Sequence, residues 1–134
     1  MKALTLIQPW ATLIMLGEKK IETRSWNTKY RGQIAIHAGK KVDKKVFCDP
    51  FYKDILKKHN ISLENIQTSC IIATCDILDV QSTESLIGII SDKEKKLGNF
   101  SPNRFGWILT NINPIVPTLP AKGMLGLWEY KGRI

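Results

Sequence analysis

Cysteine is scarce in this sequence, and its spacing excludes two common uses of that residue. The chain has Cys48, Cys70 and Cys75, an odd number with no CxxC pair and no cluster of histidines nearby. Disulfide frameworks need paired cysteines, and zinc sites need closely spaced Cys or His ligands. We therefore expect free thiols, no metal site and a reducing, cytoplasmic compartment.

Long hydrophobic runs and common cofactor motifs are also missing. No stretch approaches the roughly 20 apolar residues that a membrane-spanning helix needs. Polar residues and Pro9 interrupt the N-terminal segment before it resembles a secretory signal. The GxGxxG, P-loop, GxSxG and HExxH patterns do not occur. The sequence thus predicts no membrane association and no bound cofactor.

The length and composition predict one folded domain. The chain has 134 residues, too few for two cores that each bury enough apolar surface. Its 43% hydrophobic and 24% charged residues are typical of a globular protein and not of a disordered tail. We expect a single domain over residues 1–134.

Positive charge is unevenly distributed along the chain. Residues 1–60 hold 13 Lys or Arg against 5 Asp or Glu, whereas residues 61–134 hold 7 of each, so the whole net charge of +8 belongs to the first part. A basic surface favours a polyanionic partner, because neutralising phosphates releases counterions. Nucleic acid is one interpretation. A basic face that is simply solvated, or that binds a protein partner, is the alternative.

Apolar periodicity and turn residues predict about six strands with several short helices. Asp49-Pro50 is typical of a helix start and divides residues 40–59 into two helices. The prolines of residues 114–123 predict a loop, because proline cannot pair in a central strand. The order of elements shows no regular βαβ alternation, which favours an α+β mixed barrel over a doubly wound sheet. The expected strands cover 2–7, 20–26, 33–38, 70–80, 105–111 and 124–130, with a helix over 10–16 and helical turns within 82–97.

One motif makes the sequence similar to a known family. Gly17, Lys19, Glu22 and Arg24 match the G-x-K-x-x-E-x-R pattern of the ASCH domain family, and flanking and C-terminal segments also match it. The resemblance implies a PUA-like β-barrel with a cleft lined by these residues, and RNA binding is suspected for the family. Some small relatives hydrolyse acetylated cytidine, and ribonuclease activity is attributed to another. The matching segments include residues 6–11, 17–26, 30–32, 36–38, 106–107, 120–123 and 125–128.

The chemistry of the motif supports a nucleobase site independently. On a strand, Glu22, Arg24 and Trp26 share one face, while Lys19 stands at the turn before the strand. An aromatic ring can stack on a base, a guanidinium can bind phosphate, and a carboxylate can accept from amino groups. The alternative is a surface lysine, an ion pair on an edge strand and a core tryptophan.

Further candidate ligand residues lie outside the motif. Gln8 and Trp10 flank a helix start, where backbone N–H groups favour an anion. Arg31, like Lys29, lies on a polar loop within reach of a phosphate, and His37 is a candidate acid or base lining the cleft. Asn103 and Arg104 precede a strand and are candidates for contact from the far side.

Two classes of function remain open from the sequence, with a protein-interaction adaptor as a third. The first is a small RNA- or nucleotide-binding domain whose partner is RNA or a modified nucleoside, with DNA as a further polyanion. The second is an amidohydrolase acting on acetylated cytidine, or a ribonuclease, with Lys19 and Glu22 as catalytic residues. The hydrolytic relatives have threonine where this chain has Glu22, and Thr23 points to the opposite face of the strand. Their second carboxylate is unassigned among Glu64, Asp76, Asp79 and Glu84.

Overall fold

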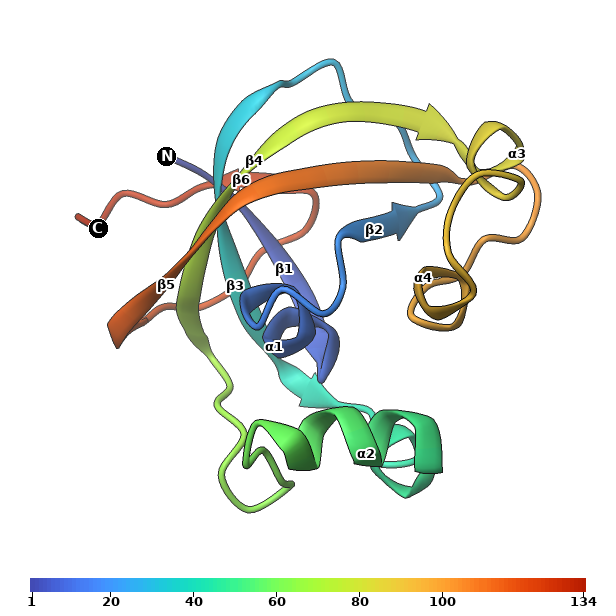
Figure 1. Ribbon diagram of the computed structural model, residues 1–134. Coiled ribbons are helices and arrows are strands. Elements are labelled where there is room, and N and C mark those ends of the chain that lie inside the picture. The colour runs from blue at the N-terminus through green and yellow to red at the C-terminus, as the bar shows by residue number, and fades with distance from the viewer.

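One curved sheet of six strands organises residues 1–134 in the computed structural model (Figure 1). The strand order is β2-β5-β4-β3-β1-β6, and only the β1–β3 pair is parallel. The predicted α+β class is therefore confirmed, although β2 and β6 form two separate edges and the sheet does not close into a barrel. The strands are β1 (Lys2–Gln8), β2 (Ile21–Arg24), β3 (Gly32–Val42), β4 (Cys70–Ser82), β5 (Phe105–Pro120) and β6 (Leu127–Glu129).

Short helices cover the ends and the inside of this sheet. Helix α1 (Trp10–Met15) packs against β1, β3, β4 and β5, and its Ala11 and Ile14 join the main core. Figure 1 shows α2 (Pro50–Lys58) at one end of the sheet, and α3 (Thr83–Leu86) and α4 (Asp92–Lys96) at the end where β4 finishes and β5 begins. None of these helices has the length and apolarity needed to cross a membrane.

The second helix predicted within residues 40–59 is confirmed, and the first is wrong. Asp49 caps α2 by accepting a hydrogen bond from the Phe51 backbone N–H at 2.9 Å. Before it, β3 continues to Val42, which lies in register with Gln8 of β1, and only a single 3-10 turn, η1 (Val46–Cys48), follows. Pairing with β1 supplies backbone hydrogen bonds that outweigh a weak local helical preference.

The loop predicted over residues 114–123 is wrong for 114–120, because β5 runs through the prolines to Pro120, and it is confirmed only for 121–123. Pro114 lies opposite Ala73 of β4, and Pro120 lies opposite Cys70. β2 pairs only with residues 105–108, so the rest of β5 is an edge strand with one neighbour. An edge tolerates proline, because the missing N–H faces the unpaired side.

Candidate functional site

A pocket of about 540 Å³ opens where β1, β2 and the segment after α4 meet. Five residues of β2 and its extension line it, together with the turn that precedes β2. Residues far away in sequence form the opposite wall. The pocket therefore depends on the sheet order and not on one local segment. Its lining residues are Thr5, Leu6, Ile7, Trp10, Lys19, Glu22, Thr23, Arg24, Ser25, Trp26, Tyr52, Leu97, Gly98, Asn99 and Arg104.

Lys19 is buried in the floor of this pocket. Its side chain is 1% exposed, and Nζ donates a hydrogen bond to the Leu97 carbonyl at 2.7 Å. Glu22 Oε1 lies 3.8 Å from the same nitrogen. Gly98 leaves room for the amine, since a Cβ at that position would lie 3.2 Å from Nζ. The alternative of a surface lysine is therefore wrong.

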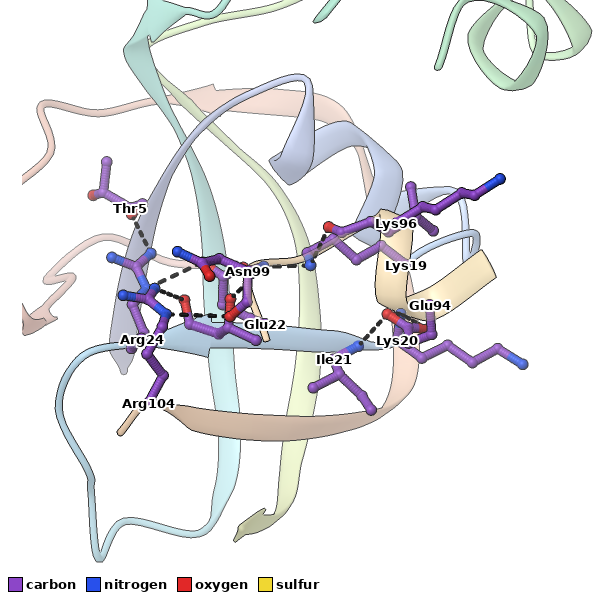
Figure 2. Close-up of polar contacts among 12 residues, drawn as sticks. Thr5, Lys19, Lys20, Ile21, Glu22, Arg24, Glu94, Lys96, Asn99 and Arg104 are labelled. Carbon is purple, nitrogen blue, oxygen red and sulfur yellow. Dashed lines mark hydrogen bonds and ion pairs between the residues drawn. The ribbon is translucent and has the colours of Figure 1, made fainter. Parts of the chain in front are cut away.

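Burial and charge act on Lys19 in opposite directions. Desolvation lowers the pKa of its amine below the ordinary 10.5, while the carboxylates of Glu22 and Glu94 counteract part of that change. Glu94 on α4 is itself buried and accepts hydrogen bonds from the backbone N–H groups of Lys20 and Ile21. Figure 2 shows Glu94 beside the start of β2. Glu94 is not among the residues that line the pocket.

Glu22 connects Lys19 to Arg24. Its second oxygen, Oε2, lies 3.1 Å from Arg24 Nε, and Arg24 Nη2 donates to the Thr5 carbonyl of β1 at 2.9 Å. The guanidinium is thus fixed by two strands that are not neighbours in the sheet (Figure 2). Because a guanidinium carries five N–H donors, these contacts leave donors for a ligand.

The far wall adds a second guanidinium. Arg104 donates from Nε to the Asn99 carbonyl at 3.2 Å and from Nη2 to the Thr23 carbonyl at 3.3 Å. The Asn99 backbone N–H in turn donates to the Thr23 hydroxyl. Figure 2 shows Arg104 and Arg24 together at the end of β2 opposite Lys19. Three cations and one carboxylate line the pocket, which favours an anion.

Three aromatic side chains, Trp10, Trp26 and Tyr52, line the pocket beside the aliphatic residues Leu6, Ile7 and Leu97. Trp26 is half-buried and packs edge to face on the fully buried Trp107, with ring centroids 4.8 Å apart. Trp10 packs against Tyr52 of α2 with centroids 6.3 Å apart, and the Tyr52 hydroxyl donates to a backbone carbonyl of α4. Trp26 and Trp10 both line the pocket.

An ion cluster outside the pocket connects the end of α2 and helix α4 to the residue that precedes Lys19. Glu18, just before Lys19, pairs with Lys58 at 2.8 Å and His59 at 2.6 Å beside α2, and with Lys93 of α4. Hydrogen bonds from these three partners lower the Glu18 pKa to about 2. This cluster fixes α4, and with it the Leu97 carbonyl that accepts from Lys19.

Five of the eight predicted ligand residues line one pocket, and the other three lie elsewhere. Lys19, Glu22, Arg24, Trp26 and Trp10 come together there. Gln8 is buried and donates hydrogen bonds to the Thr12 hydroxyl and the Gln67 carbonyl. Arg31 pairs with Asp79 at 3.4 Å. His37 is buried on the other side of β1.

Sequence patterns gave no signal for part of the lining. Tyr52, Leu97, Gly98 and Asn99 reach the pocket from α2 and from the end of α4, and no local spacing indicates this. Of the two far-side candidates, Arg104 lines the pocket and Asn103 does not. None of the four carboxylates considered as a second acid lines the pocket, and Glu22 is the only carboxylate in its lining.

The ASCH domain family model matches residues 4–117, which is most of the chain and contains the whole pocket lining. The chain belongs to the ASCH domain family. The hallmark residues Lys19, Glu22 and Arg24 are thus those whose side chains meet in the pocket.

Two curated proteins and two solved structures illustrate the relationship. Activating signal cointegrator 1 from Mus musculus is 27% identical over 135 residues and that from Homo sapiens is 28% identical over 134; each alignment covers 98% of this chain. The chain spans only 22% of the length of either protein. The crystal structure of ASCH from Zymomonas mobilis shares the fold: the TM-score is 0.53 at 13% identity, and the alignment covers 89% of this chain and 72% of the other. A mutant of that protein aligns with the same TM-score over 74% of its chain.

Proposed function

We propose that this ASCH domain binds RNA or a nucleotide, with one nucleobase and its phosphate held in the pocket. The observation that carries the proposal is the convergence of Lys19, Glu22 and Arg24 on one open pocket with an aromatic wall. A nucleotide combines a flat aromatic surface, a polar edge and a dianionic or monoanionic phosphate. The pocket supplies a partner for each of these.

Each group has a defined task in this proposal. Arg24 and Arg104 donate to the phosphate, because both keep free N–H groups beside their structural hydrogen bonds. Trp26 stacks on the base, and Glu22 accepts from an exocyclic amino group. Lys19 already donates to the Leu97 carbonyl, so it acts as a fixed cation that orients Glu22.

Replacing Trp26 tests the stacking step. Trp26→Ala is expected to weaken binding of cytidine 5′-monophosphate by about 1–3 kcal/mol, or about fivefold to 150-fold, because the base loses its aromatic platform. The measurement is isothermal titration calorimetry at low salt. Trp26→Leu keeps much of the apolar contact with Trp107 but has no aromatic face, and is expected to lose nearly as much affinity.

The melting temperatures of both variants show whether a loss of affinity comes from lost stacking or from a less stable fold. A Trp26→Leu protein that melts near the wild-type temperature and still loses affinity supports stacking. If Trp26→Leu binds the nucleotide as tightly as the wild type, the side chain is only a packing partner of Trp107, and this part of the proposal fails.

A second candidate function, hydrolysis of acetylated cytidine, is favoured by one observation. Burial lowers the pKa of the Lys19 amine, and the Glu22 carboxylate lies 3.8 Å from it, so an amine that loses its proton more easily stands beside a carboxylate, as in an acid–base pair. Contrary to the expectation from strand alternation, Thr23 lines the same pocket, where its hydroxyl accepts from the Asn99 backbone N–H. It is nevertheless one position away from the threonine of the hydrolytic relatives, and Glu22 occupies that threonine's position in this chain. Binding therefore ranks ahead of hydrolysis.

Replacing Lys19 by arginine separates the two functions. Arginine keeps the charge but cannot release a proton, so Lys19→Arg is expected to retain nucleotide binding, whereas any turnover of acetylated cytidine falls by orders of magnitude. We expect at most weak turnover from the wild type, measured as acetate release. Robust turnover that both Lys19→Arg and Glu22→Gln abolish would make hydrolysis the principal function.

A further inference from the structure

A second hollow, of about 510 Å³, lies on the other side of β1 from the pocket. The two hollows share Thr5, Leu6 and Ile7, so only the end of β1 separates them. We call the second hollow the lysine trough. It is lined by Thr5, Leu6, Ile7, His37, Gly39, Lys40, Lys41, Ser69, Lys122, Gly123, Met124 and Leu125.

Three lysines give the trough its charge. Lys40 and Lys41 come from the end of β3, and Lys122 comes from the connection between β5 and β6. All three are exposed, and none has an ion-pair partner within the chain. No Asp or Glu lines the trough. Its positive charge is therefore not neutralised by the protein itself.

The backbone that carries Lys122 is fixed in place. His37 Nε2 donates to the Ala121 carbonyl at 2.7 Å, because a carbonyl oxygen can only accept. The other ring nitrogen, Nδ1, lies 3.1 Å from the Thr5 hydroxyl. Gly123 packs so closely that a Cβ there would lie 2.8 Å from Thr5 Oγ1. The trough is thus a built surface and not a mobile loop resting on the sheet.

Thr5 links the trough to the pocket directly. Its carbonyl accepts from Arg24 on the pocket side, and its hydroxyl contacts His37 on the trough side. Exposed apolar side chains border the lysines, namely Ile7 at 47%, Met124 at 62% and Leu125 at 97% exposed. A positively charged groove tracks the backbone of single-stranded nucleic acid, and bases stack on aromatic side chains. No Phe, Tyr or Trp lines the trough, so its chemistry fits the backbone and not the bases.

We propose that the lysine trough binds the phosphodiester backbone of a single-stranded RNA whose adjoining base occupies the pocket. This inference rests on the proposed function and extends it from a nucleotide to a polynucleotide strand. A base must leave its duplex to enter a pocket, so the strand that reaches the trough is unpaired there. Lys40, Lys41 and Lys122 then neutralise phosphates next to the bound nucleotide.

Two probes of different length test the inference. The first is a fluorescein-labelled single-stranded RNA of about ten nucleotides, and the second is cytidine 5′-monophosphate, which is too short to span both hollows. The triple variant Lys40→Gln, Lys41→Gln and Lys122→Gln is expected to bind the RNA about tenfold more weakly at low salt. The slope of the logarithm of its RNA-binding constant against the logarithm of salt concentration is expected to be shallower by about 2, since each phosphate contact contributes about 0.7 to this slope for a single strand. Binding of the mononucleotide is expected to stay unchanged.

A matched variant controls for net charge. Lys44→Gln, Lys45→Gln and Lys53→Gln remove the same charge from exposed positions outside both hollows and are expected to change RNA affinity much less. Equal losses in the two triple variants, or unchanged RNA binding in the trough variant, overturn the inference while the pocket proposal stands. RNA binding that needs the trough lysines but is insensitive to Arg24→Gln supports the trough and overturns the pocket proposal. Wild-type protein that binds neither probe overturns both.

Discussion

Glu22→Gln is expected to lower the free energy of unfolding by about 3 kcal/mol, the largest effect on stability that we foresee at the site. Glu22 lies between two cations, and Lys19 is 1% exposed. Removing the carboxylate charge leaves the Lys19 amine buried with only the Leu97 carbonyl as a close partner. Urea denaturation followed by tryptophan fluorescence measures the change.

The double variant separates this charge effect from general disruption. Lys19→Met removes the buried cation, so adding it to Glu22→Gln is expected to restore part of the lost stability. If the effects of the two substitutions are simply additive, Glu22 and Lys19 are not energetically coupled, and our account of the ion pair is wrong.

The difference in free energy of unfolding between the wild type and Glu22→Gln is also expected to become smaller at alkaline pH. The folded-state pKa of Lys19 is lowered below its ordinary 10.5, so the unfolded chain binds more protons between the two values and stability rises with pH in that window. Without Glu22 the folded pKa falls further, so the gain with pH is larger in the variant. Denaturation curves at neutral and alkaline pH provide the comparison.

Arg24→Ala is expected to weaken binding of cytidine 5′-monophosphate at least as much as Trp26→Ala does, by about tenfold to 150-fold. Hydrogen bonds to a charged group contribute about 1.5–3 kcal/mol, and the guanidinium is already oriented by the Thr5 carbonyl and Glu22. Arg24→Lys keeps the charge but loses the two-pronged donor geometry, so it is expected to recover only part of the affinity.

Arg31→Ala is the matched control. Arg31 is an exposed arginine that pairs with Asp79 and does not line the pocket, so its loss is expected to leave nucleotide affinity nearly unchanged. Equal losses for Arg24→Ala and Arg31→Ala would mean that binding follows net charge, and the pocket would no longer be needed to explain it.

The local chemistry of the site could be predicted from sequence, because strand alternation alone places Glu22, Arg24 and Trp26 on one face. The motif also indicated Lys19, but not its burial. That depends on Leu97 and Gly98, which lie almost 80 residues away in sequence and approach only through the folded sheet. His37 was wrongly expected in the same cleft, since alternation gives a face of the strand but not which hollow that face meets.

The errors in the fold have a related cause. The prolines from Pro114 to Pro120 indicated a loop, and local sequence cannot show that β2 is too short to cover this part of β5. An edge strand accepts residues that a central strand excludes. In contrast, the cap at Asp49 is a local interaction, and it was predicted correctly.

The most direct test of the pocket is a nuclear magnetic resonance titration of ¹⁵N-labelled protein with cytidine 5′-monophosphate. The signals to follow are the Trp26 indole N–H, the Arg24 Nε–H and the backbone amides of Gly98 and Asn99, which lie on different walls of the pocket. We predict that all four shift together and saturate with one dissociation constant, while the Arg31 amide stays in place. Saturable shifts that spare these four signals, or no shift at all, would contradict the assignment of this pocket as the nucleotide site.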